Sequence, residues 1–231
     1  MKYTILVLAC FAAATSAVAQ EGWLVPFAAA YQPDIKGFNS AFAGNGLPEA
    51  GERQYGWGIE LRSLVGSSFL VGPMFFRTWD DASNDSFQLN TTATAILGEV
   101  GFKIAPLDFL TIIPMVGLGA VNHSFNIRTR SEDITLDSLL SAPGRNASIS
   151  SGMKFAGLAA LELGLSVGTT TGHYGLALRG GYLYSPLSPG WRLSNGARLT
   201  GSPDSRLGGV FFSAGITLVP AAQTTTTGPT F

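Results

Sequence analysis

Eight segments with a period of two, joined by connections that are short and long in turn, constrain the fold of this chain more than any other feature. The pattern predicts strands at 23–31, 55–65, 69–79, 87–104, 107–122, 152–167, 173–184 and 207–218. Tight connections at 66–68, 105–106 and 168–172 fall at one end, and the longer ones at 32–54, 80–86, 123–151 and 185–206 fall at the other. An even number of strands in this order predicts an all-β fold, an eight-stranded antiparallel up-and-down barrel.

The faces of these segments predict a barrel that spans a membrane. In 152–167, apolar residues such as Phe155 and Leu161 alternate with Lys154 and Glu162. An apolar outer face and a polar lumen are what lipid outside requires. Segment 69–79 is apolar on both faces, and Arg77 favours the odd-numbered residues being inward.

Composition agrees with this architecture. Charged residues make up 13% of the chain, hydrophobic residues 46%, and 29 glycines interrupt nearly every segment. Beyond the N-terminal segment no run of eighteen apolar residues lacks a breaker, which excludes a transmembrane helix and leaves a closed barrel as the spanning structure. A soluble lipocalin-like barrel is an alternative, but its exterior would have to be polar.

The N-terminus predicts export. Residues 1–19 form a signal peptide that ends in the small-x-small site Ala17-Val18-Ala19, and cleavage there leaves a barrel at 20–219 and a short Thr-rich periplasmic tail at 220–231. A lipoprotein signal at Cys10, the only cysteine, is an alternative that leaves a very short leader. Export and the barrel together predict the bacterial outer membrane. The net charge of −1 gives no reason to expect nucleic acid.

Ionisable residues on the predicted inward faces form the strongest candidate site. Counting from the tight turns places acids and bases near mid-barrel, at Glu60, Arg62, Arg77, Glu99, Lys154, Glu162 and Arg179. Eight strands enclose a space only wide enough for side chains, so charges there must pair. The hypothesis is a lumen plug built from a Glu/Arg/Lys network, and the alternative is a gate or selectivity element that can re-pair.

Nearer the loop end, the predicted inward positions are small or apolar. They are Ala28, Ala30, Gly117, Gly119, Ala156, Leu158, Ala160, Gly181 and Gly209. Either they line a shallow apolar pocket, or Phe211, Leu183 and loop residues fill the space.

Aromatic residues near the segment ends predict two interfacial belts. The interface aromatics are Trp23, Tyr31, Tyr55, Trp57, Trp79, Tyr182 and Tyr184.

No catalytic, cofactor or metal site is predicted. His123 and Ser124 are adjacent, so they point to opposite faces, and no nucleophile is evident. The acidic loop with Asp80, Asp81, Asn84 and Asp85 does not fit the EF-hand pattern, and the last loop is basic through Arg192, Arg198 and Arg206. These loop charges could hold loops together, bind divalent cations or lipopolysaccharide phosphates, or meet a partner.

The signal peptide, the eight alternating segments and the order of short turns and long loops resemble the small bacterial outer-membrane barrels of the OmpA transmembrane-domain, OmpX and OmpW kind, over about residues 23–218. The resemblance implies outer-membrane lipids and lipopolysaccharide as surroundings, and a structural or surface-interaction role in which external loops meet a protein or surface partner. The alternative is a narrow channel or transporter for small solutes, including hydrophobic ones. An acyl-chain hydrolase is a further alternative.

Overall fold

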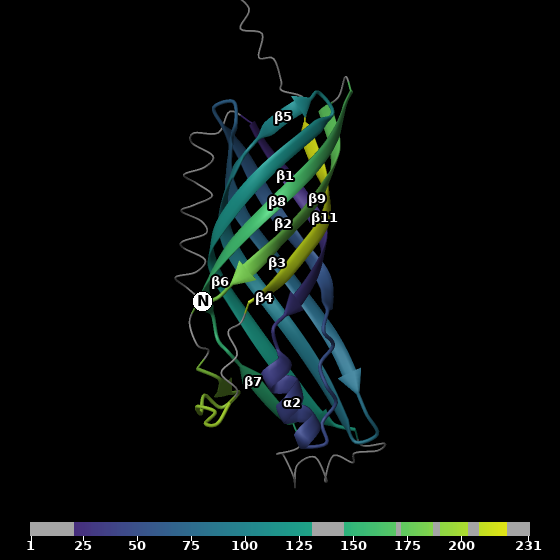
Figure 1. Cartoon of the computed structure of the whole chain (residues 1–231), viewed down its shortest axis with the longest axis vertical. Helices are drawn as coiled ribbons and strands as arrows, with labels where there is room; N and C mark the ends of the chain where they lie inside the picture. The colour runs from purple at the N-terminus through teal and green to yellow at the C-terminus, as the bar shows by residue number, and fades with distance from the viewer. Residues whose placement is uncertain (1–20, 131–145, 170–171, 187–189, 203–207, 221–231) are drawn as a thin grey trace, which may run out of the picture.

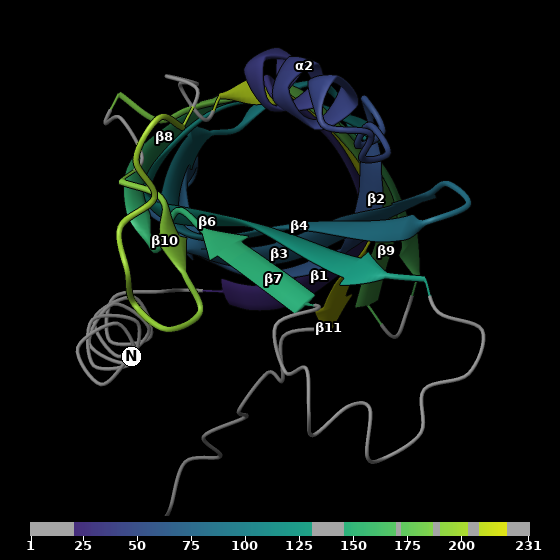
Figure 2. The same cartoon turned by 90° about the horizontal axis from the view of Figure 1, so that it is seen from below.

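The computed structural model describes residues 21–130, 146–169, 172–186, 190–202 and 208–220, which form a closed barrel (Figure 1 and Figure 2). Its eight long strands are β1 (Glu21–Pro33), β2 (Gln54–Val65), β3 (Phe69–Ser83), β4 (Phe87–Phe102), β6 (Leu110–Thr129), β8 (Lys154–Thr169), β9 (Gly172–Tyr184) and β11 (Gly209–Pro220). Each pairs antiparallel with the next in this order, and β11 pairs with β1. The predicted eight-stranded antiparallel barrel is confirmed, and its closure leaves no unpaired edge in the ring.

Short hairpins lie at one end of the barrel, which we call the turn end. Gly66 has φ of +66° in the turn between β2 and β3, a left-handed conformation that favours glycine. A short strand, β5 (Ile104–Leu107), pairs with the start of β6 and extends the next hairpin to Asp108 and Phe109. That hairpin reverses later than the predicted 105–106.

The opposite end, the loop end, carries structure that the sequence pattern assigned to loops. A helix, α2 (Lys36–Gly44), follows β1, and two short strands, β7 (Asn146–Ser150) and β10 (Arg192–Leu193), extend the sheet from β6 (Figure 2). Viewed along the barrel, α2 lies at the rim (Figure 2). No helix in the described ranges is long and apolar enough to cross a bilayer.

β3, β4 and β6 continue past the barrel at the loop end. The β3–β4 pairing runs to Ser83 and Gln88, although the sequence predicted the end of this strand at residue 79. The side-chain oxygen of Asn84 accepts hydrogen bonds from the backbone N–H groups of Ser86 and Phe87, which closes the turn. Together with β7 and β10, these extensions form a protruding sheet.

The third predicted segment faces the opposite way from the prediction. Leu70, Met74 and Phe76 of β3 are buried in the lumen, whereas Arg77 is exposed on the outer wall. Because both faces of this strand are apolar, alternation alone does not define its orientation, and Arg77 indicated the wrong one.

The orientation of β1 also differs from the prediction, because both faces of this strand are apolar as well. Phe27, Ala29 and Tyr31 point inward, and Ala28 is exposed on the outside together with the more weakly exposed Ala30. Phe27 fits because it lies over a glycine: a Cβ at Gly58 would lie 2.2 Å from its ring.

The outer wall carries large apolar side chains in every strand of the ring. Exposed examples, one from each strand, are Leu24, Ile59, Phe69, Val100, Leu118, Leu161, Leu178 and Phe212. The barrel is therefore inverted relative to a water-soluble protein, because its ion pairs lie inside and its large apolar side chains lie outside.

Candidate functional site

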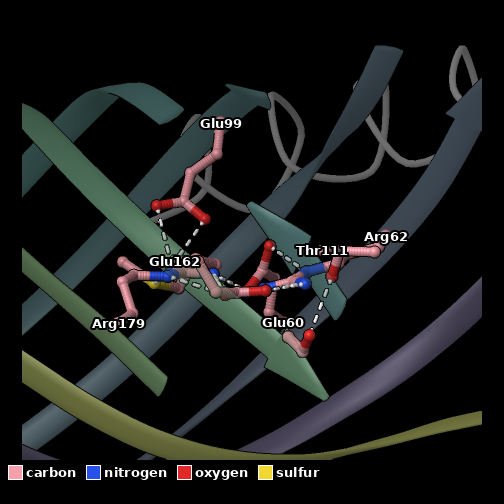
Figure 3. Close-up of polar contacts among 8 residues, drawn as sticks. Glu60, Arg62, Glu99, Thr111, Glu162 and Arg179 are labelled. Carbon is pink, nitrogen blue, oxygen red and sulfur yellow. Dashed lines mark hydrogen bonds and ion pairs between the residues drawn. The ribbon is translucent and has the colours of Figure 1, made fainter. Parts of the chain in front are cut away.

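A layer of five charged side chains crosses the middle of the lumen (Figure 3). Four strands supply it: β2 gives Glu60 and Arg62, β4 gives Glu99, β8 gives Glu162 and β9 gives Arg179. Each residue is at most 4% exposed. We call this set the ion layer.

Arg62 binds two carboxylates at once. Its Nε donates to Glu60 Oε1 at 2.7 Å, and its Nη1 donates to Glu162 Oε1 at 2.6 Å. Its Nη2 bonds the second oxygen of each acid. Bidentate, charge-assisted pairs of this kind are stronger than hydrogen bonds between neutral groups.

Arg179 contacts all three acids. Its Nη1 donates to both oxygens of Glu99, at 3.2 and 3.1 Å, and to the sulfur of Met74 at 3.2 Å. Its Nη2 donates to Glu162 Oε2 at 2.9 Å and also binds Glu60. The two arginines therefore bridge Glu60 and Glu162 jointly, whereas in the described part of the chain Glu99 pairs with no cation other than Arg179.

The charges of the ion layer do not cancel. Three carboxylates against two guanidinium groups leave a formal excess of one negative charge. Burial of ions is expensive unless pairing is good, and removing one member leaves its partner uncompensated.

Apolar side chains cover the ion layer on both sides. Toward the turn end, Leu70, Ile113 and Met115 form a buried cluster against which Trp23 packs. Toward the loop end lies a larger cluster of Phe27, Ala29, Tyr31, Met74, Phe76, Ala93, Ala95, Leu97, Val121, Ala156, Leu158, Leu183 and Phe211. The predicted apolar space is thus occupied by Phe211, Leu183 and aromatic residues of β1 and β3.

A buried polar layer follows toward the loop end. Thr78 Oγ1 donates to Gln54 Oε1 at 3.0 Å. The rings of Tyr31 and His123 have centroids 5.7 Å apart, and neither Tyr31 Oη nor His123 Nε2 has a hydrogen-bond partner in the described part of the chain.

An aromatic cap closes the loop end. Phe38 of α2 stacks on Phe125 with ring centroids 4.7 Å apart, and contacts Trp191 edge-on at 4.6 Å. Phe42 adds a further edge contact to Phe125 at 5.5 Å. We call Phe38, Phe42, Phe125 and Trp191 the aromatic cap. The alternation of strand residues does not predict this cap, although the spacing of Phe38 and Phe42, four residues apart, is typical of one face of a helix.

Two of the seven predicted network residues lie outside the ion layer. Arg77 points outward from β3, in register with Trp57 and Thr94. Lys154 follows the inward alternation of β8 but lies nearer the loop end, opposite Val121, and makes no ion pair with a described residue.

The prediction is also wrong for two of the seven interface aromatics. Tyr31 is fully buried in the lumen, and Trp23 packs into the turn-end apolar cluster. Both follow from the orientation of β1. The remaining five are exposed on the outer wall, namely Tyr55, Trp57, Trp79, Tyr182 and Tyr184.

The described residues contain no group of three or more His, Cys, Asp or Glu side chains placed to hold a metal ion. Asp80 and Asp81 of the predicted acidic loop lie in β3; Asp80 accepts a hydrogen bond from the backbone N–H of Gly51, and Asp81 accepts one from Asn90 of β4. Asp80 therefore ties the segment before β2 to β3, and Asp81 reinforces the β3–β4 pairing. Arg206 lies outside the described residues.

No known protein family and no curated protein matches the sequence. Among solved structures, Ail, the attachment invasion locus protein of Yersinia pestis, is 12% identical over 86% of this chain and 97% of its own, with a TM-score of 0.52. The complex of Ail with the heparin analogue sucrose octasulfate matches with the same values. A major outer membrane protein from Thermus thermophilus is 11% identical over 85% of this chain and 99% of its own, with a TM-score of 0.49. The chain thus has the fold of the small eight-stranded outer-membrane β-barrel proteins.

Proposed function

We propose that this chain is an integral protein of the bacterial outer membrane with a structural or surface-interaction role. The observation that carries the proposal is the outer wall, where large apolar side chains of all eight strands face outward around a closed ring. Exposed apolar surface on this scale is unfavourable in water and favourable in lipid.

Aromatic side chains support the same placement. Tyr55, Trp57 and Tyr182 are exposed toward the loop end, and Phe102 and Tyr174 are exposed toward the turn end. Belts of this kind mark the two membrane interfaces of outer-membrane barrels.

The layered lumen supports a plug rather than a pore. An ion path would have to cross the ion layer and the apolar layers on either side of it. Side chains of Met74, Phe76, Leu183 and Phe211 are at 0% exposure on the loop-end side. The channel alternative would require these side chains and the aromatic cap to move together.

A surface-interaction role is consistent with the fold comparison. Ail holds sucrose octasulfate in one of its structures, so a barrel of this fold can bind a polyanionic ligand. In this chain, outer-membrane lipids and lipopolysaccharide would surround the wall, and the loop end would meet a protein or surface partner. We propose no catalytic role.

Export through a cleaved signal peptide remains a prediction, because residues 1–19 lie outside the described residues, as do residues 221–231 of the proposed tail. Membrane fractionation of the producing cells, with N-terminal sequencing of the recovered protein, tests it. Outer-membrane protein that begins at Gln20 is the expected result, and recovery from the soluble fraction would contradict the proposal.

Single-channel recording tests the plug. The refolded protein and Glu162→Gln are compared in planar bilayers, after heat-dependent gel mobility has verified that both are folded. We expect no stable openings for wild type. Regular openings that change with the substitution would overturn the plug and favour the channel.

A further inference from the structure

The outer face of β3, β4 and β6 changes from apolar to polar at one register row. Phe75, Ile96 and Ala120 lie side by side across these strands, and the next outward-facing row toward the loop end is Arg77, Thr94 and Asn122. Beyond this row the outward positions of the protruding sheet are polar except for Trp79. Those on β4, β6, β7 and β10 are Gln88, Asn90, Thr92, Ser124, Asn126, Arg128, Ser148, Ser150 and Arg192.

Five of the polar residues form a continuous surface, which we call the polar ladder. It consists of Asp81, Gln88, Asn90, Asn126 and Arg128, where Asp81, Asn90 and Asn126 occupy one register row and Gln88 and Arg128 are paired in the next. On the inner face of the same strands, Leu89 and Ile149 are buried in one cluster with the aromatic cap. The sheet therefore has a buried inner support, and Gln88 and Arg128 are exposed on its outer face.

Some side chains of the polar ladder are held by hydrogen bonds within the sheet, and others have groups available to bind a ligand. Asn90 Nδ2 donates to Asp81 Oδ1 at 2.8 Å, and Thr92 Oγ1 donates to Asn90 Oδ1 at 3.3 Å. Gln88, Asn126 and Arg128 make no side-chain hydrogen bond within the described part of the chain. Each amide can donate and accept, and the guanidinium only donates, so the surface offers both kinds of group to a ligand.

Two shallow grooves flank the β6 strand on this face. One, of about 180 Å³, is lined by the five residues of the polar ladder. The other, of about 300 Å³, shares Asn126 and Arg128 and continues along Ile127, Ala147, Ser148 and Ser194. A ligand that follows both grooves would run across the strands and contact Arg128 from either side.

The chemistry of this surface fits a saccharide better than other ligands. Protein interfaces need an apolar centre, which the polar ladder lacks, and nucleic acid needs more positive charge than Arg128 and Arg192 supply. Sugar hydroxyls donate and accept hydrogen bonds as the amides do. Arg128 can bind a phosphate or carboxylate on the sugar through paired N–H groups.

We propose that the polar ladder binds the phosphorylated core saccharide of lipopolysaccharide molecules that lie beside the barrel. The inference rests on the proposed outer-membrane location. The polar ladder continues the same wall that faces lipid at Phe75 and Ile96, so it faces sideways along the membrane rather than away from it. The groups that lie opposite it are then those directly above the neighbouring acyl chains, which in the outer leaflet are sugars.

Side-chain amide NMR tests the proposal directly. The refolded, isotope-labelled protein in detergent micelles is titrated with delipidated core oligosaccharide from a rough-type lipopolysaccharide. We expect shifts in the amide signals of Gln88, Asn90 and Asn126, and about ten-fold weaker binding for the variant Gln88→Ala/Asn126→Ala/Arg128→Ala, because several hydrogen bonds of modest strength are lost. The control variant, Arg53→Ala, removes an exposed cation elsewhere and should bind as wild type does.

The outcomes separate the two proposals. Shifts confined to residues outside the polar ladder, or equal binding by the triple variant, would overturn the saccharide site. Dephosphorylated oligosaccharide should bind more weakly than the phosphorylated form, and equal binding of the two would overturn the role of Arg128. Because the titration uses purified protein, it can succeed or fail independently of the fractionation test of the outer-membrane location.

Discussion

Arg62 and Glu162 lie one hundred positions apart in the chain and meet across the lumen, with Nη1 of the arginine 2.6 Å from Oε1 of the acid. Their strands, β2 and β8, are separated by three strands on either side of the ring. The pair therefore spans the full width of the barrel and connects walls that share no backbone hydrogen bond.

Removal of Glu162 should destabilise the barrel strongly. Glu162→Ala leaves both Arg62 and Arg179 short of a partner, and we expect a loss of about 3–5 kcal/mol in the free energy of unfolding. Urea-induced unfolding of the protein in lipid vesicles measures it, with the exposed Glu49→Ala as control. An unchanged unfolding midpoint for Glu162→Ala would show that the ion layer does not stabilise the fold.

The three acids should differ in their tolerance of neutralisation. Glu99→Gln keeps the shape of the side chain, removes the excess negative charge and affects one arginine only. We expect it to lower the unfolding temperature least, whereas Glu60→Gln and Glu162→Gln each weaken contacts to two arginines. Thermal unfolding of the three variants side by side gives the order, and a larger loss for Glu99→Gln than for the other two would refute this account of the charge balance.

Close approach of β2 and β3 should make Gly72 intolerant of any side chain. A Cβ at Gly72 would lie 1.7 Å from the carbonyl oxygen of Leu61, so Gly72→Ala must separate the strands. We expect a much lower yield of folded barrel, measured by heat-dependent gel mobility after refolding. Gly157→Ala is the matched control, because the nearest atoms to its Cβ would be 3.7 Å away.

The aromatic cap should open without unfolding the barrel. Phe38→Ala removes the stacking on Phe125 and the edge contact to Trp191. We expect faster protease cleavage around α2 and a red shift of tryptophan emission, while gel mobility of the folded form is retained. The exposed position Lys36 on the same helix provides the control Lys36→Ala, which should leave both signals as in wild type.

Strand positions and much of the ion layer could be predicted from the sequence because polar and apolar residues alternate clearly in β2 and β8. Glu60 and Glu162 each lie on one face of their strand, and the residues next to them in the sequence, on the opposite face, are apolar. The orientations of β1 and β3 could not be predicted in this way, since both faces are apolar. The orientation of each strand depends on whether small residues lie opposite Phe27 and Phe76 inside the barrel. This in turn depends on contacts between strands.

The cap and the polar ladder depend on the same kind of long-range information. The sequence of β6 does show Asn122, Ser124, Asn126 and Arg128 at a spacing of two, which indicates a strand that continues beyond the lipid-facing region. Trp191, which packs against Phe125 on the inner face of this strand, lies more than sixty positions away in a segment without periodicity. Only the folded arrangement brings the two together.

The two halves of the chain contribute unequally to the ion layer. The first half contributes Glu60, Arg62 and Glu99, and the second contributes Glu162 and Arg179. The first half cannot satisfy its charges alone, since Glu99 needs Arg179 and the free side of Arg62 needs Glu162, whereas Glu162 and Arg179 of the second half pair with each other. Two fragments separated at the 131–145 segment should therefore be poorly stable apart and complementary when mixed, with the buried charges selecting the one alignment in which the ring closes.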